Sequence, residues 1–359
     1  MWTILKLLSW SEGYFKSFDI DSPRLTAEIL LCHVLNIRRL DLYLQFDRPL
    51  SKSELASYKS LIKRRAKKEP VAYITGVKGF WDCQFLVTPD VLIPRPDTET
   101  LLETALAMIE HKKKNMKEMN EVQDTGCELI SMDDHSDITG EQKIKVLELG
   151  TGSGAIVISL ALANPDVLFY ATDISFDAII VAIKNSINIS PSNNVSASKR
   201  ASISDRIPLT GCSLELESLK TEVSGEGLAN LFFLTGSWFS PIRQGTRFDI
   251  IVSNPPYIPT SDIENLQQEV RDYEPFLALD GGQDGLSCLK EIMRYAPDYL
   301  KPDGVLLMEM GFDQKQKLEC EAAFVSKYDT PVFIEDYAGH HRVVSLHRKI
   351  KNIENKNEI

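Results

Sequence analysis

The sequence predicts an α/β protein with a doubly wound, mostly parallel sheet and a small helical domain at its N-terminus. From residue 143 onward, short apolar runs of strand length alternate with helical stretches, and a glycine-rich segment follows the first of these runs. Such alternation is typical of a parallel sheet with helices on both faces. The first 75 residues contain no comparable alternation, and their apolar spacing is helical.

The composition is that of a globular protein. The 359 residues are 43% hydrophobic and 25% charged, and the formal net charge of −11 argues against a surface that attracts nucleic acid as a whole. The six cysteines lie far apart without a Cys-x-x-Cys pair, so we expect neither a disulfide framework nor a metal site. Without a long apolar run or a signal-peptide pattern, we expect no membrane association and a cytoplasmic location.

We assign residues 1–75 to the helical domain. One helix is expected to begin after Pro23 and a second near residue 53. The predicted apolar face of the first consists of Leu25, Ile29, Cys32, His33 and Asn36, and that of the second of Leu55, Tyr58, Leu61 and Ile62. The second helix runs into a basic segment, 63–68, which suits either a solvated helix end or a contact with an acidic or RNA-bound partner.

Residues 76–97 are expected to link the two domains as a hairpin, with 71–76 already extended. The proline-rich stretch 93–97 follows, and Asp97 is the expected N-cap of a helix through Ile109. The second domain then spans 98–350, and 351–359 form a polar tail. Two polar segments without sustained periodicity, 111–142 and 190–226, are predicted to be surface insertions.

The strands and helices of the second domain follow from its apolar runs. The expected buried strands are 145–149, 168–172, 231–235, 248–252 and 305–310. The expected helices are 155–163, 177–188, 286–300 and 314–324. Segments 331–335 and 342–347 are expected to close the sheet as an antiparallel hairpin.

A glycine loop lies where the first of these strands should pass into the first helix. Its sequence is Gly150-Thr151-Gly152-Ser153-Gly154, and Asp173 stands at the end of the next strand, where an acid accepts hydrogen bonds from ribose hydroxyls in nucleotide-binding folds. The loop also satisfies a loose G-x-G-x-x-G/A pattern, so these residues leave a nicotinamide cofactor open. Glu148 before the glycines and the G-x-G-x-G spacing resemble the first motif of class I S-adenosylmethionine-dependent methyltransferases.

The strand 248–252 leads into a turn of sequence Asn254-Pro255-Pro256-Tyr257. Its position at a strand's carboxyl end is where open α/β sheets bind ligands. The prolines have no N–H, so the turn presents carbonyl acceptors, and Asn254 adds a side-chain carbonyl. Two neighbouring acceptors match the two hydrogens of a planar –NH2 group, and Tyr257 offers an aromatic face. The turn resembles the signature of amino-methyltransferases.

The wider sequence is similar to the protein-(glutamine-N5) methyltransferases of the HemK/PrmC type. The similarity rests on segments spread over nearly the whole chain outside the two insertions and the tail. These segments are 69–76, Phe80-Trp81, 92–99, 146–154, 252–258, Asp336-Tyr337 and Arg342-Val343.

The resemblance implies a substrate, a cofactor and a set of site residues. S-adenosylmethionine would bind at Gly150, Thr151, Gly152, Ser153, Gly154, Asp173, Trp238 and Asn254. The glutamine amide in the Gly-Gly-Gln loop of a release factor would lie against Asn254, Pro255, Pro256 and Tyr257. Asn254, Pro255 and Tyr257 would serve catalysis, with Arg95 and Glu99 as further candidates for shaping the site.

Other functions stay open on the residues themselves. A nucleic-acid amino-methyltransferase would use the same turn on adenine or guanine, although the acidic balance opposes it and we expect no direct nucleic-acid substrate. A dehydrogenase and a non-catalytic adaptor are further alternatives. Residues Gly281-Gly282-Gln283 spell the tripeptide that the HemK/PrmC type modifies, but self-methylation is not expected from their place before a helix.

Overall fold

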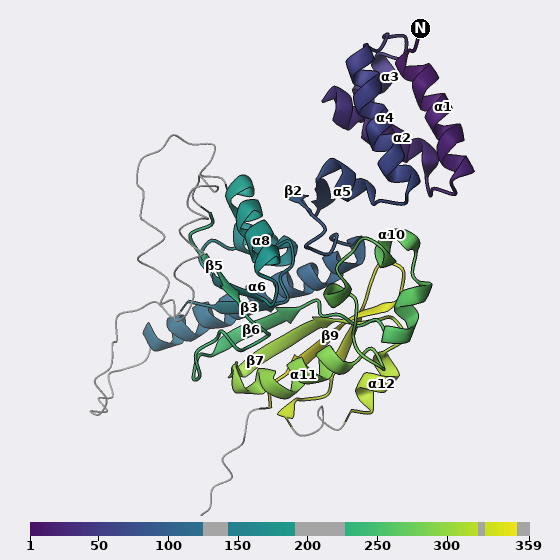
Figure 1. Cartoon of the computed structure of the whole chain (residues 1–359). Helices are drawn as coiled ribbons and strands as arrows, with labels where there is room; N and C mark the ends of the chain where they lie inside the picture. Colours follow the sequence, from purple (N-terminus) through teal and green to yellow (C-terminus); the bar gives the residue numbers. More distant parts are fainter. Residues whose placement is uncertain (125–142, 191–226, 322–326, 350–359) are drawn as a thin grey trace, which may run out of the picture.

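The computed structural model describes residues 1–124, 143–190, 227–321 and 327–349. Within these residues, a group of N-terminal helices stands apart from a unit built on a seven-stranded sheet, and a short helix and a two-stranded hairpin join them (Figure 1). The predicted tail and most of the predicted insertions lie outside the described residues.

The N-terminal helices are ordered by their caps and by a common apolar core. They are α1 (Ile4–Ser17), α2 (Pro23–Leu35), α3 (Arg39–Leu44) and α4 (Lys52–Ala66). The side chain of Thr3 caps α1, and Ser51 and Glu54 form a reciprocal capping box on α4. Tyr58 and Ile62 of α4 are buried in the shared core, as their spacing predicts.

The buried face of α2 differs from the predicted one. Leu25 is 39% exposed, whereas Ala27, Leu30 and Leu31 are fully buried. The physical reason is that α2 packs against both α1 and α4, and the Tyr58 hydroxyl of α4 donates to the carbonyl of Ala27 at 3.0 Å. The helix carries apolar residues on more than one side, so periodicity alone selected the wrong stripe.

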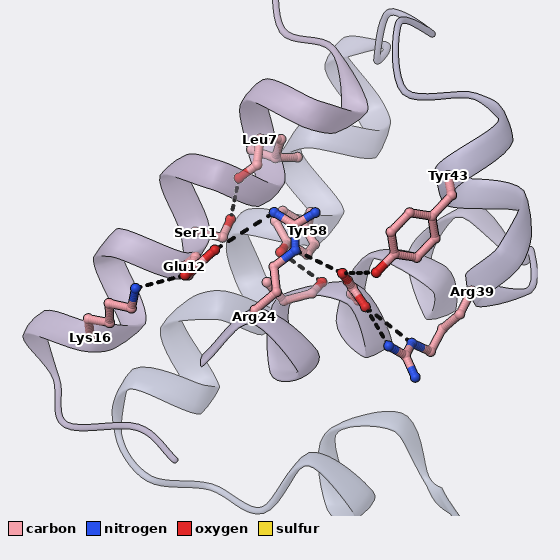
Figure 2. A network of polar contacts seen from close by, with 10 residues as sticks. Leu7, Ser11, Glu12, Lys16, Arg24, Arg39, Tyr43 and Tyr58 are labelled. Atoms are coloured by element: carbon pink, nitrogen blue, oxygen red, sulfur yellow. Dashed lines mark hydrogen bonds and ion pairs between the residues drawn. The ribbon is translucent and has the colours of Figure 1, made fainter. Parts of the chain in front are cut away.

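A buried carboxylate ties α2 to α3. Glu28, 1% exposed, accepts hydrogen bonds from Arg24 Nε, Arg39 Nη2 and Tyr43 Oη, each at 2.8 Å. Figure 2 shows Arg24, Arg39 and Tyr43 converging from two helices, with Glu12 on the far side of Arg24. Burial raises the pKa of Glu28, but these three donors outweigh burial and hold its pKa below the ordinary value.

The basic segment 63–68 is partly buried in the contact between the two domains. Arg65 is only 4% exposed, and its Nη1 binds Glu269 Oε2 at 2.7 Å. Glu269 belongs to α10 (Gln268–Arg271), and nearby Tyr273 donates its hydroxyl to the carbonyl of Lys67 at 2.8 Å. One member of the basic segment therefore neutralises an acid of the sheet domain instead of facing solvent.

The linker contradicts the extended structure predicted for 71–76. Residues Val71–Thr75 form helix α5, which ends at Gly76 in the left-handed conformation (φ +75°). Tyr73 and Ile74 are buried, and the Tyr73 hydroxyl donates to Val91 O at 2.7 Å. These long-range contacts outweigh the local β propensity. The hairpin follows as β1 (Val77–Phe80) and β2 (Cys83–Leu86).

The sheet has the strand order β5-β4-β3-β6-β7-β9-β8. Neighbouring strands are parallel except that β9 is antiparallel to both β7 and β8, which confirms the predicted fold class. The strands are β3 (Lys145–Leu149), β4 (Leu168–Asp173), β5 (Leu231–Thr235), β6 (Phe248–Ser253), β7 (Leu300–Glu309), β8 (Val332–Glu335) and β9 (His341–His347).

Helices cover both faces of this sheet, and successive strand residues point to opposite faces. Val146 packs in the core beneath α6 and α7, while Leu147 packs in the core beneath α11 and α12. Among the described residues of this unit, the α-helices besides α10 are α6 (Glu99–Asp124), α7 (Ala155–Ala163), α8 (Phe176–Ile189), α11 (Ser287–Tyr295) and α12 (Lys315–Glu319). The 3-10 turns in the described part of the chain are Pro96–Thr98, Thr260–Asn265, Phe276–Ala278 and Ala296–Asp298.

Several boundaries differ from the sequence prediction. Helix α6 continues to Asp124, so residues 111–124 of the segment predicted as an insertion are helical. Asp97 lies inside a 3-10 turn and pairs with Arg342 at 3.1 Å instead of capping α6. Helices α11 and α12 are shorter than predicted, and β7 begins already at Leu300. Among the described helices, none is both long and apolar enough to cross a bilayer.

The buried carboxylate of Glu28 predicts a specific loss of stability. Replacing Glu28 with Ala leaves Arg24, Arg39 and Tyr43 without their shared acceptor, so α1–α4 should lose about 2–3 kcal/mol. Hydrogen exchange of the amides in these helices measures the loss. Glu12→Ala is the control, because the Glu12 side chain is 30% exposed and pairs with Lys16 at the surface, so its loss should cost clearly less than the loss of Glu28. Equal effects of the two variants would contradict the role of burial.

Candidate active site

The site lies where the order of strands reverses. Strand β3 pairs with β4 on one side and with β6 on the other, so the loops that follow β3 and β6 leave the same edge of the sheet side by side. The Ser253 hydroxyl at the end of β6 donates to Leu149 O of β3 at 2.8 Å. The glycine loop and the Asn-Pro-Pro-Tyr turn begin immediately after this contact.

The glycine loop is held by the end of β4. Gly150, Gly152 and Gly154 all have positive φ (+72°, +54° and +79°), a conformation that residues with a side chain rarely adopt. Asp173 Oδ2 accepts the amide of Gly152 at 2.8 Å, and its Oδ1 accepts the amide of Ser175 at 2.9 Å. Burial raises the pKa of Asp173, although these backbone donors oppose the rise.

One cavity of about 550 Å³ connects the two loops. Both Asp173 and Asn254 line it, so the two halves of the predicted site share one chamber. The sequence-predicted residues on its wall are Arg95, Gly150, Thr151, Gly152, Ser153, Asp173, Trp238, Asn254 and Pro256.

Gly154, Pro255 and Tyr257 do not line this cavity. A Cβ on Gly154 would lie 2.8 Å from Ile158 Cδ1 and 3.2 Å from Ala182 Cβ, so this glycine permits close packing of α7 on α8. Pro255 is buried within the turn. The site roles of these three residues stay predictions.

The side chains of Asn254 and Tyr257 each make a polar contact that fixes the Asn-Pro-Pro-Tyr turn. Asn254 Nδ2 donates to Thr98 Oγ1 at 3.2 Å, and the Tyr257 hydroxyl donates to Glu309 Oε1 at 3.2 Å. Burial raises the pKa of Tyr257, so the phenol stays protonated and remains a donor. Tyr257 therefore anchors the turn through its hydroxyl, with its ring packed against the core beneath α11 and α12.

Of the other candidate residues, Trp238 and Arg95 line the same cavity and Glu99 does not. Trp238 (φ +44°) presents its ring to the loop, 3.5 Å from where a Cβ on Gly150 would stand, and donates its Nε1 to Glu291 at 3.2 Å. Arg95 forms an ion pair with the buried Glu274. Glu99 accepts the amide of Trp81 at 3.1 Å and so fastens the hairpin to α6.

Four features of the site were missed in the sequence. Thr98 and the apolar pair Phe276 and Leu277 line the cavity, and Glu274 and Glu309 stand behind it. Thr98 lies inside the segment 92–99 that carries the resemblance, which is a signal that could have found it. The two glutamates are far in sequence from the groups they bind, so no local pattern indicates them.

The tripeptide Gly281-Gly282-Gln283 has a structural explanation. Gly281 donates its amide to Ile258 O at 2.8 Å, and a Cβ on Gly281 would lie 2.8 Å from Tyr257 Cα. Because Gly281 has no side chain, the segment Gly281-Gly282-Gln283 can lie directly against the Asn-Pro-Pro-Tyr turn. Gln283 is exposed and does not line the cavity.

Comparisons with known proteins extend this description. Residues 6–76 match the family described as the PrmC N-terminal domain. The release factor glutamine methyltransferase of Geobacter sulfurreducens is 36% identical over 88% of this chain and 87% of its own length. A bifunctional methyltransferase of Rickettsia typhi is 33% identical over 96% of this chain, which spans only 57% of that relative.

Among solved structures, a methyltransferase from Pyrococcus furiosus aligns with 58% of this chain and 76% of its own, at 18% identity and a TM-score of 0.35. The doubly wound sheet, its antiparallel closing hairpin and the glycine loop at the switch point define a class I S-adenosylmethionine-dependent methyltransferase. Within that class, the chain belongs to the family of release factor glutamine methyltransferases, which confirms the resemblance seen in its motifs. In the described residues, no group of three or more His, Cys, Asp or Glu side chains is arranged to hold a metal ion.

The contact of Gly281 with the turn predicts a cost for any side chain there. Gly281→Ala should lower the free energy of unfolding by about 1–3 kcal/mol, because the new Cβ overlaps the backbone of Tyr257 and Gly285. Gly13→Ala in α1 is the control, because Gly13 has no atom within 4 Å of its Cβ position and should gain about 0.5–1 kcal/mol. Urea unfolding of both variants measures the difference, and a neutral Gly281→Ala would refute the close contact.

Proposed function

We propose that this chain transfers a methyl group from S-adenosylmethionine to the side-chain amide nitrogen of the glutamine in the Gly-Gly-Gln motif of a peptide-chain release factor. The observation that carries the proposal is the single cavity shared by the glycine loop, Asp173 and Asn254. A methyl donor and a glutamine amide that bind in the same cavity can align for direct methyl transfer without a further catalytic group.

The glycine side of the cavity fits the cofactor. A Cβ on Gly152 would meet nothing within 4 Å, so the backbone there faces open space and a ligand can approach it. Each oxygen of Asp173 has an acceptor position left for a ribose hydroxyl after its backbone contact. Bound S-adenosylmethionine supplies an electrophilic methyl group on its sulfonium.

The opposite side of the cavity fits the glutamine amide. Asn254 and Pro256 line it, and the two prolines of the turn bring no N–H donors. The side-chain carbonyl of Asn254, on the cavity wall, would accept one hydrogen of the substrate –NH2 group. The backbone carbonyl of Pro255 is the proposed acceptor of the other hydrogen, although Pro255 itself is buried beside the wall, and the pair would direct the nitrogen toward the methyl carbon. The nitrogen of an amide is a poor nucleophile, so positioning would supply much of the acceleration, up to about 7–11 kcal/mol in well-oriented systems.

The charges around the cavity favour a protein substrate over a nucleic acid. Of the described residues on its wall, Arg95 is the single cation and is already paired with Glu274, while Asp90, Glu148, Asp173 and Asp280 are acids. A phosphate backbone would meet no free positive charge here. Phe276 and Leu277 line the same cavity and are 53% and 70% exposed, which suits contact with a protein loop.

The decisive experiment offers the full-length chain three acceptors. Purified release factor, RNA and DNA are each incubated with methyl-labelled S-adenosylmethionine, and mass spectrometry locates the label. We expect methylation of the Gly-Gly-Gln glutamine alone. Label in RNA or DNA with none in the release factor would establish the nucleic-acid alternative instead.

The role of the turn predicts the effect of Asn254→Ala. This variant should keep its affinity for S-adenosylmethionine within about threefold and lose transfer by about 100-fold or more, because the substrate nitrogen is no longer oriented. Calorimetry and single-turnover rates give the two quantities. Asn265→Ala, an exposed residue on the segment that follows, is the control with unchanged transfer. Loss of cofactor affinity without a turnover defect would contradict the role.

The position of the glycine loop on the cavity wall predicts that two glycine variants lose similar stability but differ in their affinity for S-adenosylmethionine. Gly152→Ala and Gly245→Ala both place a side chain at positive φ with no neighbour within 4 Å, so each should cost about 1–2 kcal/mol of stability. Only Gly152 lines the cavity, so only Gly152→Ala should weaken S-adenosylmethionine binding, by about tenfold or more. Calorimetric titration with S-adenosylmethionine measures both affinities. An unchanged affinity of Gly152→Ala would contradict a role of the glycine loop in cofactor binding.

A further inference from the structure

We propose that Thr98 is a positioning residue which, together with the buried carboxylate of Glu309, fixes which end of the Asn254 side-chain amide faces the substrate. The proposal rests on the function proposed above and deepens it, because it concerns how the acceptor side of the cavity is set. Thr98 and Asn254 both line the cavity, whereas Glu309 is hidden behind the turn.

The first observation is the contact between Thr98 and Asn254. Asn254 Nδ2 donates to Thr98 Oγ1 at 3.2 Å, which turns the Asn254 nitrogen toward the protein. Thr98 is 5% exposed and is held in the 3-10 turn Pro96–Thr98 at the start of α6. The nitrogen and oxygen of an asparagine amide have nearly the same shape, so only the surrounding hydrogen bonds decide which end faces a ligand.

The second observation is a buried carboxylate behind Thr98. Glu309 is 1% exposed at the end of β7, and its Oε1 accepts the Tyr257 hydroxyl at 3.2 Å. Its Oε2 makes no hydrogen bond of standard geometry within the described residues. Burial raises the pKa of Glu309, and the neighbouring Thr98 hydroxyl opposes this rise, so Thr98 stands where it stabilises the charged form.

These two observations are the basis for the hydrogen-bond directions that we assign to Thr98 and Asn254. In this proposal Thr98 directs its single hydrogen toward Glu309, because an ionised carboxylate can only accept and the buried Oε2 has no other donor among the described residues. The Thr98 oxygen is then left as an acceptor, and the group of Asn254 that matches an acceptor is its –NH2. The Asn254 carbonyl oxygen therefore faces the cavity, where a substrate –NH2 needs an acceptor.

Protonation of Glu309 would reverse this order. A neutral carboxyl can donate to Thr98, which can then donate to the Asn254 oxygen and turn the Asn254 –NH2 toward the substrate –NH2. Two donors cannot bond, so the acceptor pair is lost. The charged groups near Glu309 are Arg342, which favours its ionised form, and Asp97, which opposes it.

The rate of methyl transfer should therefore depend on pH through the charge of Glu309. Burial raises the pKa of Glu309 to about 7, although Thr98, Arg342 and Tyr257 lower it. Since the pKa of this carboxyl is raised, its ionised form is present above about pH 7 and is lost as the pH falls through that value. The rate of methyl transfer should therefore fall as the pH drops below about 7, while the affinity for S-adenosylmethionine changes little.

The test compares Thr98→Val, which has the same shape without a hydroxyl, with Thr98→Ser, which keeps the hydroxyl. We expect Thr98→Val to lower kcat about 10- to 100-fold, with S-adenosylmethionine affinity within about threefold, and Thr98→Ser to recover most of the rate. Thr100→Val is the matched control, because Thr100 is equally buried (5%) but does not line the cavity, and its rate should equal that of the wild type.

A second variant keeps the test decisive if Thr98→Val fails to fold. Glu309→Gln preserves shape but can donate, so it should lower kcat and abolish the change of rate between pH 6 and 8 that the wild type shows. Wild-type rates of Thr98→Val, an equal loss in Thr98→Ser, or a wild-type pH profile in Glu309→Gln would each overturn the proposal. Absence of transfer by the wild-type chain would instead refute the proposed function.

Discussion

The parallel pairing of β3 with β6 is the constraint on which the site depends. Leu149 and Ser253 are paired at the ends of these strands, and the Ser253 hydroxyl bonds the Leu149 carbonyl. Two loops about 100 residues apart in the chain therefore emerge beside each other. Asp173, at the end of β4, is brought in by the next pairing in the same sheet. The cavity between donor and acceptor groups is thus a consequence of strand order.

The segment after the Asn-Pro-Pro-Tyr turn connects this cavity to the helical domain. Glu269 on this segment binds the buried Arg65 of α4, and Glu274, five residues on, accepts Arg95 and the amide of Ile93. Burial raises the pKa of Glu274, but Arg95 opposes the rise and compensates the carboxylate charge. One stretch of chain therefore fixes the docking of the helical domain and one wall of the cavity.

Prediction from the sequence succeeded where a single local pattern carries the information. The strands β3 and β5 and the helix α7 have the predicted bounds, because each stands in the sequence as an apolar run of its own length. Gly152, Asp173 and Asn254 meet in one cavity, as expected from residues that follow neighbouring parallel strands. Glu274 and Glu309 could not be found in this way, because each binds a partner from a distant part of the chain.

By itself, the sequence determined the sheet, the position of the glycine loop after β3 and the family to which the chain belongs. Only the tertiary structure decided which stripe of α2 is buried, that residues 71–75 form a helix and that Arg65 is enclosed between domains. Local periodicity and turn chemistry act over a few residues, so they determine strands and loops. Burial against a partner, and the orientation of an amide such as that of Asn254, depend on groups that only folding brings together.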